Sequence, residues 1–173
     1  MKLSIGGERK RDGWVTLNAD PRYEPDIVAA VPPLPPYVVD RQWDEVEAFH
    51  MVEHVHRWEA VELVSQIHWA LAPGGRFVVE LPDISYCMKV FLGQVKPPRG
   101  AEHQFDLWGI YGDWNHRNPL YCHKFGYTPK TLCDMFVEAG FQRGMLKVKP
   151  AETHYPQRDF RLEAYKEEPC TTT

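Results

Sequence analysis

The apolar positions along the chain fall into short runs typical of strands and longer stretches with helical spacing. Five runs predict strands: Lys2–Ile5, Val15–Asn18, Asp26–Val31, Glu45–Met51 and Arg76–Leu81. The last contains Phe77, Val78 and Val79 in succession, as in a parallel strand that is covered on both faces. Met145–Val148 and Phe160–Tyr165 alternate apolar with polar residues and predict a final pair of strands.

Helical spacing appears in stretches between these strands. In Trp58–Leu71, residues recur at steps of three and four and predict a buried face made of Val61, Val64, His68 and Leu71. The sequence Ala72-Pro73-Gly74-Gly75 predicts the end of that helix, because proline cannot continue it. Thr128-Pro129 predicts the start of a helix that ends at Gly140. Its buried stripe is Leu132, Met135, Phe136 and Ala139, and Asp83–Leu92 is a further predicted helix.

Strands and helices alternate, and two strands close the chain, which predicts an α/β fold. The sheet is expected to be mostly parallel with an antiparallel edge strand. Only nine residues, Gly6 to Trp14, separate the first two strands. A parallel crossover with a full helix needs roughly a dozen or more residues. We therefore expect at most one helical turn there, and a thinly covered sheet face that a homodimer contact is one way to cover.

The whole chain is predicted to form a single domain over residues 1–166. Residues 94–127 form an irregular insertion rich in histidine and aromatic residues, and residues 167–173 are expected to be a flexible tail.

Composition narrows the class of protein. The 173 residues include 20 Lys+Arg and 24 Asp+Glu, and a net charge of -4 argues against a nucleic-acid partner. The apolar runs are too short to span a membrane, and the N-terminus lacks an apolar signal core. The four cysteines include no Cys-x-x-Cys pair. These features predict a reduced, cytoplasmic protein without a membrane partner.

In parallel α/β sheets, ligands bind beyond the carboxyl ends of the strands. The residues expected at that edge are Gly6-Gly7, Asn18 to Asp20, Ala30-Val31 and His50 to Glu53.

Four segments, in order, resemble one known family. They are Leu3–Gly7, Trp43–His54, Leu71–Asp83 and His123–Phe141, with Leu-Ala-Pro-Gly-Gly at 71–75 as the most specific piece. The chain resembles small class I S-adenosylmethionine-dependent methyltransferases, and most of all their compact, methyltransferase type 11-like bacterial and phage branch. The resemblance implies a doubly wound Rossmann-like sheet, S-adenosylmethionine as cofactor, and a small or sugar-like acceptor. It places Ile5, Gly6, Gly7, Asn18, Asp20, Val31, His50 and Met51 around the cofactor.

The acceptor side is expected in the insertion after the fifth strand, by analogy with the family. His54, His116 and His123 are the predicted catalytic residues, because imidazole titrates near neutral pH. Tyr111 or Tyr127 is a candidate for orienting an acceptor. The alternative is a small aromatic core whose histidines are merely hydrogen-bonded.

Three departures from the family pattern support a second hypothesis. Glu8 stands where the cofactor loop usually has a glycine, Asn18 replaces an acidic residue, and Ala30 replaces an aspartate. A catalytically silent binding or scaffold protein is therefore the alternative to an enzyme.

A third hypothesis comes from His50-Met51-Val52-Glu53-His54, which matches the His-x-x-Glu-His motif of zinc peptidases. That chemistry requires both histidines on one helical face. The alternation of Val46, Ala48 and His50 instead favours a strand ending near His50. A zinc hydrolase using His50, Glu53 and His54 stays a remote alternative, and no metal site is predicted.

Overall fold

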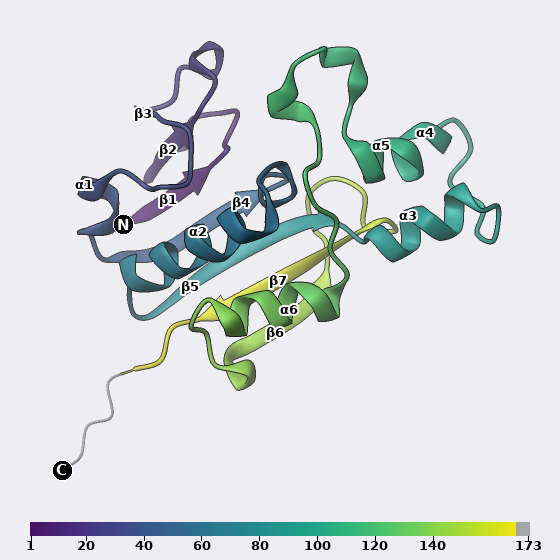
Figure 1. Cartoon of the computed structure of the whole chain (residues 1–173). Helices are drawn as coiled ribbons and strands as arrows, with labels where there is room; N and C mark the ends of the chain where they lie inside the picture. The colour runs from purple at the N-terminus through teal and green to yellow at the C-terminus, as the bar shows by residue number, and fades with distance from the viewer. Residues whose placement is uncertain (169–173) are drawn as a thin grey trace.

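A seven-stranded sheet organises the chain, whose computed structural model describes residues 1–168 (Figure 1). The strands are β1 (Lys2–Ile5), β2 (Trp14–Asn18), β3 (Ile27–Val28), β4 (Trp43–Phe49), β5 (Leu71–Pro82), β6 (Leu146–Pro150) and β7 (Asp159–Tyr165). Their spatial order is β3-β2-β1-β4-β5-β7-β6. Strand β7 runs opposite to the other strands of the sheet, and it lies between β5 and β6. The predicted mostly parallel, Rossmann-like sheet is confirmed, and residues 169–173 of the expected tail lie outside the described residues.

The helices form one layer and an insertion. They are α1 (Pro36–Val39), α2 (Arg57–Ala70), α3 (Ile84–Phe91), α4 (Glu102–Phe105), α5 (Leu107–Tyr111) and α6 (Pro129–Glu138). Short 3-10 turns are η1 (Pro21–Tyr23), η2 (Val52–His54), η3 (Trp114–His116), η4 (Pro119–Tyr121) and η5 (Arg143–Met145). In Figure 1, α2 and α6 lie in front of the sheet, and α4 and α5 stand apart with the insertion. No helix within residues 1–168 has the length and apolar character needed to cross a membrane.

The apolar core lies between this helical layer and one face of the sheet. Leu132, Met135 and Phe136 of α6 and Ala139, which follows it, are buried in it, as predicted. The predicted face of α2 is partly wrong, because Val61 and His68 are only half-buried. The buried residues of this helix are Ala60, Leu63, Val64, Ile67 and Ala70. Because α2 packs against β5 and α6, its buried stripe is rotated slightly from the predicted stripe, which included His68.

Two predicted strands end earlier than expected. Strand β4 ends at Phe49, because His50 adopts a φ of +48° and turns the chain away from the sheet. Strand β3 contains only Ile27 and Val28 before the proline-rich segment. Both ends lie at the edge where ligands bind in such sheets.

The second face of the sheet is polar. The connection between β1 and β2 contains no helix, which confirms the predicted short crossover. The residues that point to this face and are nonetheless buried include Ser4, Thr16, Glu47, Glu80, Arg161 and Glu163. Their charges are paired with one another or with loop residues. Within residues 1–168 this face thus receives no helix from the β1–β2 connection, and paired polar side chains occupy it.

Two ion-pair networks account for this burial of charge. Ser4 Oγ donates to Glu47 at 2.8 Å, and Arg11 of the β1–β2 loop pairs with the same carboxylate. Arg161 lies between Glu80 (2.7 Å) and Glu163 (3.2 Å). Buried carboxylates of this kind are stable only when paired and hydrogen-bonded.

This arrangement predicts sensitivity to acid. Burial alone would raise the pKa of Glu163, but hydrogen bonds from Lys149 and Tyr165 outweigh it and lower the pKa from 4.5 to about 2. A carboxylate with a lowered pKa stabilises the fold above its unfolded-state pKa and loses that effect as the pH falls. We expect the free energy of unfolding in urea to decrease between pH 4.5 and pH 2. In Glu163→Gln it should start about 1–2 kcal/mol lower and vary less with pH.

The matched control is Glu62→Gln on the exposed face of α2, where the carboxylate accepts an exposed hydrogen bond from Gln66. Its acid profile should follow that of the wild type. Equal acid profiles for Glu163→Gln and the wild type would contradict the proposed role of the network.

Candidate functional site

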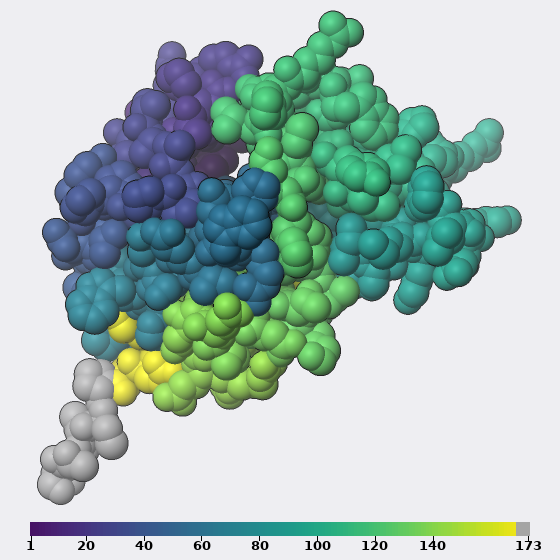
Figure 2. All heavy atoms as spheres, in the orientation of Figure 1, coloured from purple at the N-terminus to yellow at the C-terminus, as the bar shows by residue number. Residues whose placement is uncertain are grey.

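A cavity of about 380 Å³ lies at the carboxyl ends of β1, β2 and β4. The residues that line it are Ile5, Gly6, Glu8, Leu17, Asn18, Ala19, Asp20, Tyr23, Ala29, Ala30, Val31, His50, Met51, His54, Val55, Glu59, Leu120 and Tyr121. Figure 2 shows the molecule hollowed between the purple N-terminal segment and the green insertion. The sheet edge and the insertion thus enclose one space between them.

Gly6 forms the tight turn at the end of β1. Its φ is +76°, and its N–H donates to the carbonyl of Leu17 at 2.7 Å. A Cβ at this position would lie 3.0 Å from Cγ of Met51. Both the conformation and the close approach require glycine here.

The end of β2 is fixed by two hydrogen bonds of the Asn18 amide. Its Nδ2 donates to the carbonyl of Gly7 (3.1 Å), and its Oδ1 accepts from the N–H of Asp20 (2.9 Å). Asp20 in turn accepts from the backbone and side chain of Arg22, each at 3.0 Å. These bonds to Arg22 lower the pKa of Asp20 to about 2. Asn18 therefore shapes the turn, while Asp20 supplies an ionised carboxylate at the cavity wall.

The insertion is joined to this turn by tyrosines. The hydroxyls of Tyr23 and Tyr121 are 2.8 Å apart, and Tyr121 also donates to Asp20 at 3.4 Å. The imidazole of His116 stacks on the Tyr121 ring, with ring centroids 4.3 Å apart. Tyr121 thus connects the insertion to the sheet edge across one wall of the cavity.

His50 links the cavity to the buried carboxylates. Its Nδ1 lies 3.3 Å from Glu53 and its Nε2 lies 3.1 Å from Asp159. Burial alone lowers the pKa of His50, but these two carboxylates outweigh it and raise the pKa to about 9. Burial would likewise raise the pKa of Glu53, and the facing His50 reverses that effect and lowers it to about 2. The result is a half-buried imidazolium held between two buried carboxylates.

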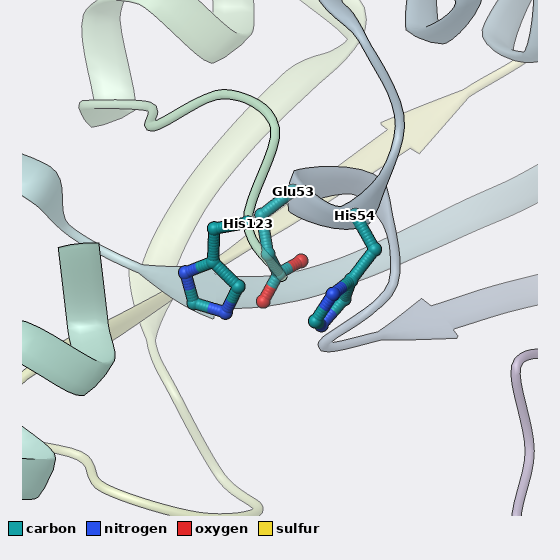
Figure 3. Close-up of side chains that lie close together, drawn as sticks. All are labelled: Glu53, His54 and His123. Atoms are coloured by element: carbon teal, nitrogen blue, oxygen red, sulfur yellow. The ribbon is translucent and has the colours of Figure 1, made fainter. Parts of the chain in front are cut away.

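Glu53, His54 and His123 gather beside this pair (Figure 3). One nitrogen or oxygen atom from each lies within 4.8 Å of the others. Figure 3 shows the Glu53 carboxylate between the two imidazole rings. Burial lowers the pKa of His123 and favours its neutral form, although the Glu53 charge opposes this. Segments 53–54 and 123, far apart in sequence, thus build one polar cluster, and His54 also lines the cavity.

Comparison with known proteins identifies the family to which this fold belongs. A family profile described as "Methyltransferase domain" matches residues 9–143, well over half of the chain. The chain belongs to this methyltransferase family.

Several solved structures share the fold of this chain. A SAM-dependent methyltransferase from Archaeoglobus fulgidus is 15% identical with a TM-score of 0.59, over 95% of this chain and 85% of that one. A protein from Thermotoga maritima, described as a possible histamine N-methyltransferase, is 14% identical with a TM-score of 0.62, over 96% and 82%. An S-adenosylmethionine-dependent methyltransferase from Mesorhizobium loti is 14% identical with a TM-score of 0.56, over 95% and 90%. A search of curated proteins gives no significant match.

Most residues predicted to surround the cofactor of this methyltransferase line the cavity. They are Ile5, Gly6, Asn18, Asp20, Val31, His50 and Met51. Gly7 does not line it, because a Cβ at this position would point at Ser4 Oγ on the polar face of the sheet. Leu120 and Tyr121 come from the insertion in which the acceptor side was expected, whereas the sequence did not indicate Tyr23.

The three predicted catalytic histidines do not all lie together in the methyltransferase. His54 and His123 lie together, with ring centroids 4.8 Å apart. His116 lies on the outer side of Tyr121, where its side chain is 49% exposed and contacts Asp113 at 3.5 Å. It lines neither the cavity nor the cluster, and its stacking contact with Tyr121 connects it to the cavity wall.

The His-x-x-Glu-His interpretation is wrong on structural grounds. His50 follows a strand, and residues 52–54 form only the 3-10 turn η2. His50 and His54 are therefore not on one face of a helix, and both nitrogens of His50 face carboxylates. The zinc-peptidase arrangement requires that helix.

Proposed function

We propose that this methyltransferase transfers a methyl group from S-adenosylmethionine to a hydroxyl of a small or sugar-like acceptor. The observation that carries the proposal is the cavity, in which the predicted cofactor residues meet a wall from the insertion and the polar cluster at His54. S-adenosylmethionine is the methyl donor, and residues 1–166 would act as one unit.

The residues of the cavity fit the proposed cofactor. Its volume is within the usual range for small-molecule sites. Ile5, Leu17 and Val31 offer apolar surface for an adenine ring, and the ionised Asp20 offers acceptors for ribose hydroxyls. Gly6 leaves the space that a side chain would fill. Glu8, an unexpected carboxylate in this loop, suits the cationic ammonium and sulfonium groups rather than the carboxylate of the cofactor.

The cofactor supplies an electrophilic methyl group, so the protein must orient the acceptor and exclude water. In the transfer, a bond forms between the acceptor oxygen and the methyl carbon. The carbon–sulfur bond breaks, and its electron pair remains on sulfur. The hydroxyl must also lose its proton, and a polar group near the acceptor assists this loss. We assign that role to the Glu53–His54–His123 cluster.

Thermal unfolding with S-adenosylmethionine and with S-adenosylhomocysteine tests cofactor binding. A ligand at about a hundred times its Kd stabilises by roughly 2.7 kcal/mol, which corresponds to a rise in Tm of about 5–10 °C for a domain of this size. Transfer of a radiolabelled methyl group to a panel of sugars and small alcohols then tests the acceptor class. No stabilisation by either ligand would contradict the proposal, and binding without any transfer would favour the silent alternative.

A further prediction concerns the hydrogen bonds of the Tyr121 hydroxyl with Tyr23 and Asp20, which we call the tyrosine bridge. Tyr121→Phe removes the hydroxyl that joins the insertion to Tyr23 and Asp20. Loss of hydrogen bonding of this kind costs about 1 kcal/mol, so calorimetry should show the Kd for S-adenosylmethionine rising about 3–10-fold. Tyr37→Phe is the control, because Tyr37 lies exposed on α1 away from the cavity. Equal affinities for both variants would refute a role of the bridge in binding.

A further inference from the structure

We propose that Glu53, His54 and His123 form a binding site for a divalent transition-metal ion, with Zn²⁺ as the ion that fits best. The location of the site on the acceptor side rests on the proposed function. The metal site itself rests on the geometry of these three side chains alone.

Glu53 provides the first observation. Its side chain is 2% exposed, and neither carboxylate oxygen accepts an aligned hydrogen bond within residues 1–168. His50 faces it at 3.3 Å as an ion-pair partner. Buried carboxylates normally receive several hydrogen bonds, so a group left with free lone pairs toward two imidazoles indicates a missing ligand.

The two histidines present the right atoms. His54 Nδ1 lies 3.2 Å from the carbonyl oxygen of Cys122, and His123 Nδ1 lies 3.2 Å from that of Gly109. A carbonyl oxygen only accepts, so each Nδ1 carries the hydrogen, and the neutral ring then has its lone pair on Nε2. Histidines that bind metals are held in this way, with the other ring nitrogen donating to a carbonyl or carboxylate.

The spacing of the three groups suits an ion rather than direct hydrogen bonds. Their ligand atoms lie within 4.8 Å of one another, yet neither imidazole forms an ion pair or hydrogen bond with Glu53 in the described part of the chain. Zinc binds nitrogen and oxygen at about 2.0–2.2 Å, which sets neighbouring ligand atoms about 3.4 Å apart. Small side-chain rotations would close the site around an ion.

The backbone around the three ligands is already fixed. The N–H groups of Lys124 and Phe125 both donate to the carbonyl of Glu53, at 2.7 and 3.3 Å. The N–H of His123 donates to the carbonyl of Tyr111 at 3.0 Å. These bonds hold segments 53–54 and 123–125 together without the ion, as expected of a preorganised site.

Two histidines and one carboxylate are the ligand set of many catalytic zinc sites, which keep a fourth position open. His54 belongs both to this set and to the cavity wall. An acceptor hydroxyl bound at the open position would have its pKa lowered by the ion. The site therefore narrows the acceptor class to molecules that offer a hydroxyl oxygen as a metal ligand, such as polyols and sugars.

The test uses the full chain, stripped with a chelator and dialysed, and titrated with ZnCl₂ by calorimetry in the absence of S-adenosylmethionine. We expect one Zn²⁺ per chain and a rise in Tm on its addition. Glu53→Gln, His54→Ala and His123→Ala should each weaken the affinity by about 100-fold and remove the rise in Tm. His103→Ala is the matched control, because it removes an exposed histidine of the insertion that is not in the cluster.

Absence of zinc binding by the stripped wild type would overturn the proposal. Unchanged affinity in the three variants would also overturn it, since the ion would then bind elsewhere. Co²⁺ absorption of the wild type gives a second measurement that does not depend on any variant folding. Tetrahedral bands without a thiolate charge-transfer band support the site, whereas a thiolate band would place a cysteine among the ligands and refute the assignment.

The proposed function and the metal site can be refuted independently of each other. Stabilisation by S-adenosylmethionine is measured on the metal-free protein and tests the proposed function. Zinc binding is measured without S-adenosylmethionine and tests the metal site. A protein that binds the ion and not the cofactor would retain this inference and lose the other.

Discussion

Replacing Gly6 by valine is expected to weaken S-adenosylmethionine binding by at least about 100-fold. The φ of +76° is strained for any side chain with a branched Cβ, and the new atom would lie 3.0 Å from Met51 in the cavity wall. The Gly6 N–H also bonds to Leu17, so a shift of this turn would displace the end of β2 as well. Calorimetric titration with the cofactor measures the effect.

The control for this variant is Gly13→Val. Gly13 has a similar φ of +80°, but a Cβ there would meet nothing within 4 Å. This variant should show the backbone strain, of order 1–2 kcal/mol, as a lower Tm while keeping its cofactor affinity. If Gly6→Val bound the cofactor as well as Gly13→Val, the turn after β1 would not be the cofactor loop.

Removing the side chain of Arg161 is expected to lower the free energy of unfolding by about 3–4 kcal/mol. Arg161 is 8% exposed and pairs with Glu80, which is fully buried, and with Glu163. Arg161→Ala leaves two buried carboxylates without their shared cation, and the remaining hydrogen bonds from Thr153 to Glu80 satisfy only part of the charge. Urea denaturation at neutral pH measures the loss.

Lys130→Ala provides the comparison. Lys130 pairs with Asp134 at 2.7 Å on α6, but its side chain is 83% exposed. Exposed pairs of this kind contribute less than about 1 kcal/mol. A similar loss in both variants would mean that burial of the Arg161 network does not determine its contribution.

The order of strands and helices could be predicted from the sequence because each carries a local pattern. The strand at Phe77–Val79, the start of α6 at Thr128-Pro129 and the short first connection all depend on neighbouring residues or on loop length. The errors occur where tertiary structure decides. The buried face of α2 depends on the position of α6, and the end of β4 depends on the turn at His50.

The candidate site, too, could be predicted from the sequence only in part. The glycine turn and the ends of the strands were predictable, since a parallel sheet brings these ends to one edge. The pairing of His54 with His123 was not, because it requires residues 53 and 124–125 to meet through backbone hydrogen bonds. Likewise, no linear pattern relates Tyr121 to Asp20, about a hundred positions away. His116 has the same residue type as His123 and a different environment, which composition does not reveal.

The polar face of the sheet also bears on how this fold could have changed over evolutionary time. A helix inserted between β1 and β2 would need an apolar underside, and that side would pack onto Glu47 and its partners. Each such carboxylate would lose water and loop contacts at once, at a cost of several kcal/mol. An inserted helix would therefore be tolerated only if the strands beneath it also changed. The short connection and the charged strands are thus coupled, because changing one without the other is unfavourable.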